Sequence, residues 1–324
     1  MNNENPKDLR DIQPTSFRHI IGQTHVKKAL QIAVESSFAE GKRLDEVLLC
    51  GPAGVGKSAL VAVLASECAV PYKEILAQSI TNTAELNGTL LEASAGNGLL
   101  LFLDEIHLLH PAIQHALLLV LDRRRIFLNT GKTVQSISVG DFTLVGATTN
   151  PEGLIEPLLS RFRIIAHLDY YSLEDLAQIV RQKCLAMAWE YEPELPDEIA
   201  KRGHDTPRIA IRHLLAARRC QMAEGAKLIT VAHLRLACEI ERISDLGLDN
   251  TQQKYLRLLD GSGQRLNVLA SQLGVGTKVL TKTVEPFLLR SGLILKTDAG
   301  MRQLSQKGRE HLATLATETM QKQP

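Results

Sequence analysis

A glycine-rich segment followed by lysine and serine is the part of this sequence whose residue types suggest chemistry most directly. It reads GPAGVGKS from Gly51 to Ser58, and it stands between an apolar run at 47–49 and a predicted helix at 59–65. Glycines let such a loop bend so that successive main-chain N–H groups face phosphate oxygens, and the following helix adds the positive end of its dipole. We therefore expect a nucleoside triphosphate to bind along the segment, at Gly51, Gly54, Val55, Gly56, Lys57, Ser58 and Ala59.

Two side chains at the end of this segment have distinct expected roles. Lys57 is expected to reach the β- and γ-phosphates, and the Ser58 hydroxyl is expected to ligate Mg²⁺. The sequence thus predicts ATP and Mg²⁺ as the groups that this part of the chain binds.

A second chemical signal is an apolar run, 99–103, that ends in Asp104 and Glu105. A carboxylate at the end of a buried strand is the partner that a phosphate-binding loop (P-loop) such as 51–58 needs, so we expect Asp104 to hold Mg²⁺ and Glu105 to activate water as a general base. We interpret the neighbouring His107 as a residue of a helix face. The letters DEIH also occur in one class of helicase, but those enzymes need two motor lobes and a late arginine motif, and this chain has neither.

Two further residues are candidates for sensing or stabilising the γ-phosphate. Thr149 follows the predicted strand 142–147, and it can reach the phosphate if that strand lies between the P-loop strand and the Asp-Glu strand. Arg161 precedes the predicted strand 164–168, where an arginine can act as a finger into a neighbouring subunit's ATP.

Composition sets the broad class of the protein. The chain has 324 residues, 44% of them hydrophobic, and no apolar run of membrane-spanning length, so we expect a cytoplasmic protein with two or three domains. The five cysteines are scattered without a C-x-x-C pair, which indicates small buried side chains rather than zinc ligands or disulfides.

The last part of the chain has the pattern of a winged helix. Two predicted helices, with leucines from 266 and from 280 and a kink at Pro286, precede a two-stranded wing at 293–304. Residues 246–324 carry 11 Lys/Arg and 6 Asp/Glu, a charge of +5, against −4 for the rest of the chain. The plausible DNA phosphate contacts are Lys278, Lys282, Lys296 and Arg302. Use of the same fold for protein contact stays open as an alternative.

With these pieces in place, the chain resembles AAA+ ATPases and, more narrowly, is similar to the RuvB family of Holliday-junction branch-migration motors. The narrower likeness rests on the stretches 104–107, 142–149, 206–210 and 284–288. The fold class that it implies is α/β: an AAA+ parallel-sheet P-loop domain, an all-α lid and a C-terminal winged helix. The expected bounds are an arm at 1–16, then 17–171, 172–245 and 246–315, and a tail at 316–324.

The resemblance also implies roles that the residues alone do not give. It implies a homo-hexameric ring around double-stranded DNA with ATP at the subunit interfaces, Arg161 as the finger and Arg208 as a second sensor of the nucleotide. It places Ile12 and Tyr171 near the nucleoside, and it implies a RuvA-like partner bound through a predicted hairpin at 126–137.

Several positions depart from the family pattern. Gln13 replaces an arginine, Asp122 and Arg123 replace an acidic pair, and Ala299-Gly300-Met301 replaces Arg-Gly-Arg in the wing. The hairpin is shorter and has a polar tip. Catalytic groups are kept while partner and DNA surfaces change, which is the pattern of a diverged paralogue.

The sequence therefore predicts an ATP-dependent motor that acts on four-way DNA junctions in recombination and repair. Two alternatives stay open at this stage. One is a clamp-loader or initiator-like AAA+ remodeller, and the other is a DNA-binding regulator whose oligomeric state is switched by ATP.

Overall fold

The computed structural model of the protein describes residues 14–93, 98–129 and 134–321. The chain separates into two compact units. The first contains Met1–Met187 with Thr206–Arg208, and the second contains Ala188–Asp205 with Ile209–Pro324. This division groups residues that pack compactly together and does not test the domain bounds expected from the sequence. Those bounds remain predictions.

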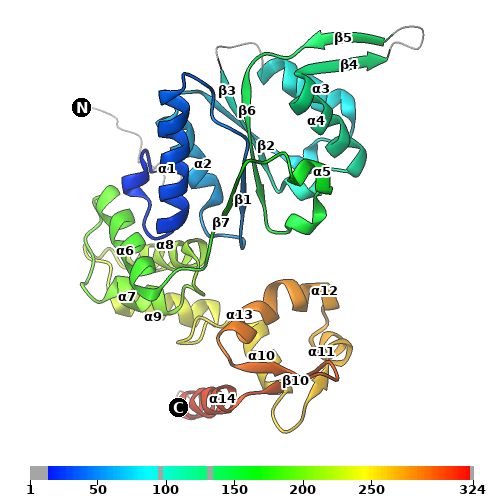
Figure 1. Cartoon of the computed structure of the whole chain (residues 1–324). Helices are drawn as coiled ribbons and strands as arrows, with labels where there is room; N and C mark the ends of the chain where they lie inside the picture. The colour runs from blue at the N-terminus through cyan, green and yellow to red at the C-terminus, as the bar shows by residue number, and fades with distance from the viewer. Residues whose placement is uncertain (1–13, 94–97, 130–133, 322–324) are drawn as a thin grey trace. The chain divides into compact units, whose positions relative to one another are not determined.

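The first unit is organised around a five-stranded parallel sheet (Figure 1). Its strands are β1 (Val47–Cys50), β2 (Tyr72–Leu76), β3 (Leu99–Asp104), β6 (Phe142–Thr148) and β7 (Ile164–His167). They lie in the order β2-β3-β6-β1-β7, so β6 lies between the P-loop strand β1 and the Asp-Glu strand β3. The α/β fold and the neighbourhood assumed for Thr149 are both confirmed.

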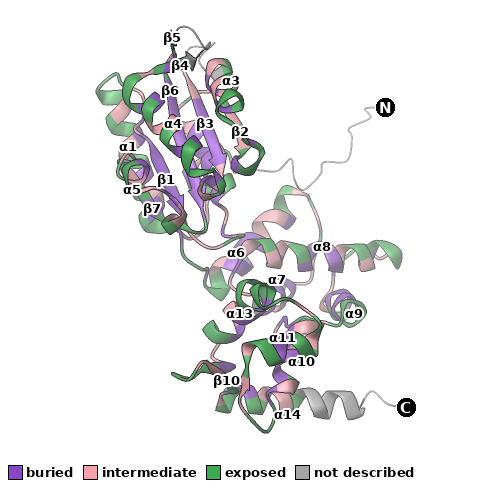
Figure 2. Ribbon diagram, turned by 90° about the vertical axis from the view of Figure 1, so that its right-hand side faces the viewer, coloured by how far each residue is buried: buried purple, intermediate pink, exposed green. Residues whose placement is uncertain are grey.

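Helices cover both faces of this sheet. Figure 1 shows α1 (Thr24–Ala39) and α2 (Lys57–Glu67) on one face, and α3 (Thr83–Ala93), α4 (Pro111–Arg123) and α5 (Glu156–Leu159) on the other. Strands covered on both faces are apolar throughout rather than alternating, and every residue of β1 and β6 is buried (Figure 2). One hydrophobic core cluster packs side chains of α3, α4 and α5 against β1 and β3.

A β-hairpin follows α4. It pairs β4 (Arg125–Asn129) with β5 (Val134–Ser138) in antiparallel register, with Ile126 opposite Ile137. The predicted hairpin is confirmed, while its tip at 130–133 lies outside the described residues. The remaining long helix of this unit is α6 (Leu173–Ala186), whose N-terminus is capped by the Ser172 side chain.

The second unit begins with helices. They are α7 (Leu195–Lys201), α8 (Pro207–Ala223), whose residues from Ile209 on belong to this unit, and α9 (Val231–Glu241), which confirms the helices predicted in this region. Thr230 and His233 form a reciprocal capping box at the start of α9.

The winged helix forms the rest of this unit. Its elements are α10 (Asn250–Leu258), α11 (Leu266–Leu273), α12 (Thr277–Val279), α13 (Glu285–Arg290), α14 (Gln306–Gln321), and the small sheet β8 (Gln264–Arg265), β10 (Met301–Leu304) and β9 (Ile294–Lys296). The kink predicted at Pro286 appears as a π-helical turn, Leu280–Val284, immediately before α13. Proline cannot donate to the helical ladder, and here the N–H of Glu285 reaches back to the carbonyl of Leu280 instead.

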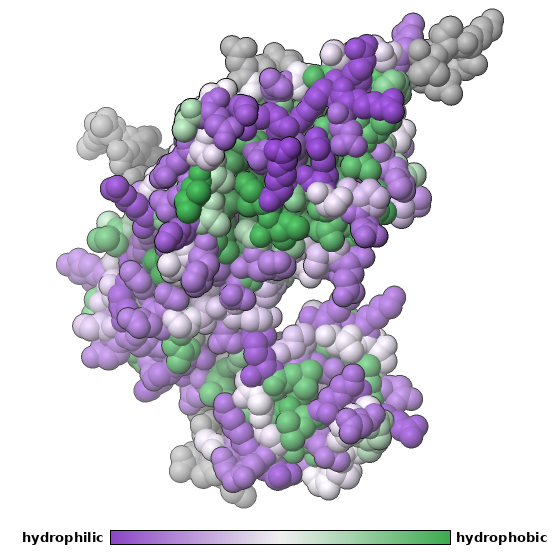
Figure 3. Space-filling view, in the orientation of Figure 1, coloured by the Kyte–Doolittle hydropathy of each residue, from purple (hydrophilic) through white to green (hydrophobic). Residues whose placement is uncertain are grey.

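The surface and the cysteines are unremarkable for such a fold. Hydrophobic side chains on the face shown in Figure 3 are interrupted by hydrophilic ones. None of the helices among the described residues has the length and apolar character needed to cross a membrane. All five cysteines are free, three of them buried and two partly buried.

Candidate functional site

The P-loop forms an open cradle of main-chain amides at the carboxyl end of β1. Gly56 has φ +96° and directly precedes α2, a conformation that favours glycine. From Gly54 through Ala59, the main-chain N–H groups have no hydrogen-bond acceptor among the residues that the structure describes. Amides left unpaired at a helix N-terminus are suited to phosphate oxygens, so the loop fits a polyphosphate.

Arg208 lies directly against this loop. Its N–H donates to the carbonyl of Gly54 over 3.3 Å, and a Cβ added at Gly54 would lie 2.9 Å from the Cβ of Arg208. Gly54 also has φ +82°. Glycine is therefore required at this position by both its backbone conformation and its neighbour, and the candidate second sensor lies beside the phosphate cradle.

Lys57 is folded back onto its own loop. Its ammonium donates to the carbonyls of Gly51 and Pro52 over 2.9 and 3.0 Å, and the residue is 7% exposed. Burial lowers the pKa of Lys57, with the carboxylates of Glu105 and Asp104 opposing that effect. The cation thus lies inside the site, within electrostatic reach of the acidic pair.

Asp104 and Glu105 end β3 at the same edge of the sheet. Asp104 Oδ1 accepts the N–H of Glu105 over 3.0 Å. Glu105 has φ +50°, a left-handed conformation that is uncommon for a residue other than glycine and is often found at functional sites. Because of this turn, the chain changes direction between the two residues, and their carboxylates contact different partners.

Thr149 is the partner of Glu105. Glu105 Oε2 accepts the Thr149 N–H over 3.1 Å and the Thr149 hydroxyl over 2.9 Å. Thr149 is exposed, and it follows β6, which lies between β1 and β3. The structure therefore brings the expected base and the expected sensor into direct contact.

His107 also contacts Glu105, which our interpretation of it as a helix-face residue missed. Its Nδ1 lies 3.2 Å from Glu105 Oε2 and 3.0 Å from the hydroxyl oxygen of Thr148. No periodicity in the sequence indicates this contact, because it depends on the left-handed turn at Glu105.

Arg161 is paired within its own subunit. Its Nε lies 3.3 Å from Asp122 Oδ1, and its Nη2 donates to the carbonyl of Leu121 over 3.1 Å. The Nε makes no hydrogen bond of acceptable geometry within the described part of the chain. Asp122, one of the positions that departs from the family pattern, is thus the residue that holds the candidate finger.

Tyr171 connects the P-loop to the segment before α1. Its hydroxyl donates to the carbonyl of Val55 over 3.1 Å, and its ring lies against Gly22. Burial raises the pKa of this phenol. Ile12, the other residue expected near the nucleoside, lies outside the described residues, as does Gln13.

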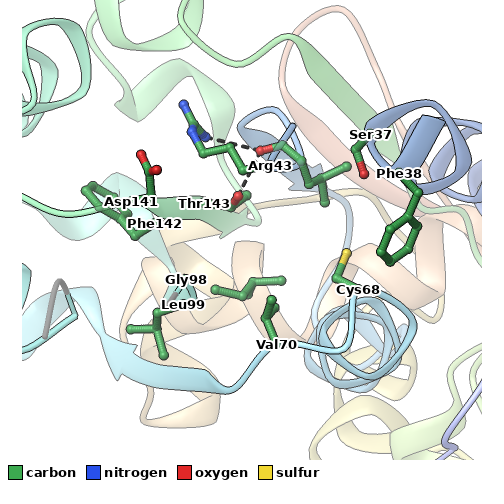
Figure 4. Close-up of a pocket in the computed structure, with 12 residues that line it drawn as sticks. Ser37, Phe38, Arg43, Cys68, Val70, Gly98, Leu99, Asp141, Phe142 and Thr143 are labelled. Atoms are coloured by element: carbon green, nitrogen blue, oxygen red, sulfur yellow. Dashed lines mark hydrogen bonds between the residues drawn. The ribbon is translucent and has the colours of Figure 1, made fainter. Parts of the chain in front are cut away.

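A small cavity of about 90 Å³ lies at the opposite end of the sheet (Figure 4). It is lined by the start of β3 and of β6 and by the ends of α1 and α2, including Phe38, Cys68, Leu99 and Phe142. Ligand pockets usually measure about 300–1,000 Å³. This cavity is therefore separate from the P-loop and too small for a nucleotide.

The basic candidates of the winged helix divide into two groups. Lys278, Lys282 and Lys296 are exposed. Arg302 is 7% exposed, and its guanidinium donates to both carboxylate oxygens of Glu285, over 2.8 and 3.1 Å. The structure thus uses this side chain inside the domain, and the contact of Arg302 with DNA expected from the sequence stays an untested prediction.

Glu285 also accepts the Tyr255 hydroxyl over 2.5 Å. Burial, followed by the hydrogen bond to this carboxylate, raises the pKa of Tyr255. The Arg302–Glu285–Tyr255 cluster joins the wing to α13 and α10 and is a structural feature of the domain.

Comparison with known proteins gives a consistent family for both ends of the chain. Residues 12–168 match the Holliday junction DNA helicase RuvB P-loop domain, and residues 245–313 match the RuvB C-terminal winged helix domain. The chain is 35% identical over 309 residues to a Holliday junction branch migration complex subunit RuvB from Thermotoga maritima, covering 93% of this chain and 92% of that protein. The chain belongs to the RuvB family.

Two further relatives support this placement. The RuvB of Prochlorococcus marinus strain NATL2A is 33% identical over 309 residues, which cover 93% of this chain and 86% of that protein. The structure of the Thermotoga maritima RuvB Holliday junction branch migration motor has a TM-score of 0.80 and 34% identity, covering 93% of this chain and 98% of that one. As in the RuvB family, the P-loop domain precedes the winged helix here.

Proposed function

We propose that this protein is an ATP hydrolase that uses ATP turnover to move four-way DNA junctions. Its RuvB relatives are named for branch migration of Holliday junctions. An open cradle of main-chain amides, Lys57 and the Glu105–Thr149 pair lie together at one edge of the sheet. This arrangement is the observation that carries the proposal.

Each residue of this site has a role in the proposed hydrolysis. Bound ATP supplies the γ-phosphoryl group that is transferred to water. The amides of 54–59 hold the phosphate oxygens, and Lys57 turns from the loop carbonyls toward the β- and γ-phosphates. Ser58 and Asp104 would together hold Mg²⁺, since a hydroxyl and a carboxylate are oxygen ligands of the kind that this ion prefers.

Glu105 is the proposed general base. One of its oxygens, Oε2, is engaged by Thr149 and His107, which leaves Oε1 to accept a proton from the attacking water. Arg208 lies beside Gly54 and is the proposed second sensor of the bound nucleotide.

The remaining parts of the proposed function concern the assembly of subunits and the binding of DNA. Arg161 acts on the ATP of the next subunit in a ring, proposed to be a homo-hexamer, since a head-to-tail arrangement places one subunit's finger at its neighbour's site. The exposed Lys278, Lys282 and Lys296 bind phosphates of double-stranded DNA. The hairpin β4–β5 is the proposed contact for a RuvA-like partner.

Phosphate release with and without a synthetic four-way junction tests this function. The wild-type chain is expected to release phosphate from ATP and to do so faster with the junction. The Glu105→Gln variant should lose at least about 10²-fold of that rate, because general bases contribute at least that much. Glu152→Gln, which removes an exposed carboxylate just after β6, is the matched control and should keep the wild-type rate.

A further inference from the structure

We propose that His107 is a positioning residue that anchors Glu105 for hydrolysis, an inference that rests on the proposed ATPase activity. His107 lies in a short 3₁₀ turn, Ile106–Leu108, that directly follows Glu105. Its side chain is 16% exposed, and its Nδ1 lies 3.2 Å from Glu105 Oε2. The imidazole therefore lies beside the proposed base.

The imidazole is itself fixed by Thr148, a residue with no exposed surface. The hydroxyl oxygen of Thr148 lies 3.0 Å from His107 Nδ1 and accepts the N–H of Asn150 over 2.9 Å. A Cβ added at Gly153 would lie 2.9 Å from the Cβ of His107, so the turn after β6 also packs closely against this residue. The ring is thus held between the end of β6 and the turn that follows it.

The tautomer of His107 follows from its two neighbours. Nδ1 carries either a proton or a lone pair, so it cannot donate to Glu105 and accept from Thr148 at once. A lone pair facing the carboxylate 3.2 Å away would be repelled by it, whereas an Nδ1–H is attracted to Glu105 Oε2 and can be accepted by the Thr148 hydroxyl oxygen 3.0 Å away. The arrangement selects the Nδ1–H form.

With this proton in place, the carboxylate of Glu105 is held from one side only. Oε2 accepts the N–H and the hydroxyl of Thr149 and lies 3.2 Å from the imidazole Nδ1, while Oε1 has no hydrogen-bond donor among the residues described. A base fixed through one oxygen presents the other in a defined direction. Since displacement by about 1 Å can cost about 10²-fold in rate, a group that fixes this carboxylate affects turnover and not nucleotide binding.

The test is the steady-state ATPase of the full chain with four substitutions. His107→Ala removes the donor, and we expect kcat to fall about 10-fold while KM and the affinity for a fluorescent ATP analogue change less than about twofold. His107→Asn places an amide N–H where the imidazole Nδ1–H stands, so it should recover most of kcat. Thr148→Val loosens the ring and should give an intermediate loss. His110→Ala, which removes an exposed imidazole three residues away, should leave kcat unchanged.

The outcomes separate the two claims. Absence of ATPase from the wild-type chain would refute the proposed function itself. A wild-type chain that hydrolyses ATP while His107→Ala keeps its full kcat would refute the role of His107 alone. An equal loss in His107→Ala and His107→Asn, accompanied by loss of nucleotide affinity, would also overturn it, because that pattern belongs to a residue that only supports the fold.

Discussion

Arg161 and Asp122 lie next to each other in one subunit, with Nε and Oδ1 3.3 Å apart, although they are far apart in the sequence. Asp122 lies near the end of α4, and Arg161 follows α5. The pair is about one-third and one-half exposed. An ion pair as exposed as this one contributes little stability, so Arg161 is available for another partner.

This relationship leads to a prediction for mixed assemblies. Arg161→Ala should lower the ATPase rate about 10³-fold, the range found for arginine fingers. Asp104→Asn should be inactive because Mg²⁺ is no longer held, but it keeps its arginine. Mixing the two inactive variants should restore part of the activity, measured as phosphate release against mixing ratio. Arg163→Ala, which removes an exposed arginine two residues on, is the control expected to stay active.

No recovery at any ratio would contradict a site shared between subunits.

A second prediction concerns the close approach of Gly54 to Arg208. Gly54→Ala places a Cβ 2.9 Å from the Cβ of Arg208 at a backbone φ of +82°, so the loop must move. We expect nucleotide affinity to fall at least about 10-fold, measured by fluorescence titration with an ATP analogue. The control is Gly88→Ala in α3, where an added Cβ meets nothing within 4 Å. That change should stabilise the fold by about 0.5–1 kcal/mol and leave affinity unchanged. Equal nucleotide affinities for the two variants would contradict the argument that Arg208 leaves no room for a Cβ at Gly54.

The nucleotide site was largely predictable because its signals are contiguous. The glycine loop with Lys57 and the strand ending in Asp104 and Glu105 are each written in a few consecutive residues, and the parallel order of β3, β6 and β1 brings Thr149 to them. Contacts that depend on how separate segments meet were not predictable. The left-handed turn at Glu105 that brings in His107 leaves no periodic trace in the sequence.

The wing gives the clearest case of a side chain whose surroundings could not be predicted from the sequence. The sequence places Lys296 and Arg302 on adjacent strands, and the structure pairs them across the ladder. Residues paired directly across an antiparallel ladder lie on the same face of the sheet, so strand alternation does not separate the exposed Lys296 from the buried Arg302. The buried carboxylate of Glu285, on another element, is what draws Arg302 inward.

A third prediction separates these two basic residues. Lys296→Ala should weaken binding to a DNA duplex and lower the slope of log K against log salt by about 1, as expected for one lost phosphate contact. Lys254→Ala removes the same charge from α10 and should change the slope less. Fluorescence anisotropy over a series of salt concentrations measures both. Identical slopes for the two variants would remove Lys296 from the DNA surface.

Arg302→Ala should instead destabilise the second unit. It leaves the buried Glu285 carboxylate without its main partner, at a cost of about 3–5 kcal/mol. Urea unfolding followed by circular dichroism measures this loss. A change in DNA affinity with unaltered stability would contradict the internal role of Arg302.

A fourth prediction follows from His213, a buried residue of α8 whose Nε2 donates to the carbonyl of Arg202 over 3.1 Å. Burial, with help from Arg212 and His204, lowers its pKa from 6.5 to about 4. Between these two values the unfolded chain binds more protons than the folded one, so stability is full above pH 6.5 and falls as the pH drops toward 4. The loss from this group is on the order of 3 kcal/mol.

His213→Gln keeps a side-chain N–H but binds no proton, so unfolding curves between pH 7 and 4 should show a smaller acid loss. His25→Gln, at an exposed position of α1, is the control for removing a histidine. The same acid loss in His213→Gln as in the wild type would show that other groups cause it.

The measurement that tests the central claim most directly is branch migration of a synthetic four-way junction, followed as conversion of the labelled junction into two duplexes. The wild-type chain, with its RuvA-like partner if the hairpin requires one, should convert the junction with ATP and Mg²⁺. It should fail with a non-hydrolysable ATP analogue, and Glu105→Gln should fail with ATP. Equal conversion by Glu105→Gln, or conversion supported by the analogue, would contradict a motor driven by hydrolysis at this site.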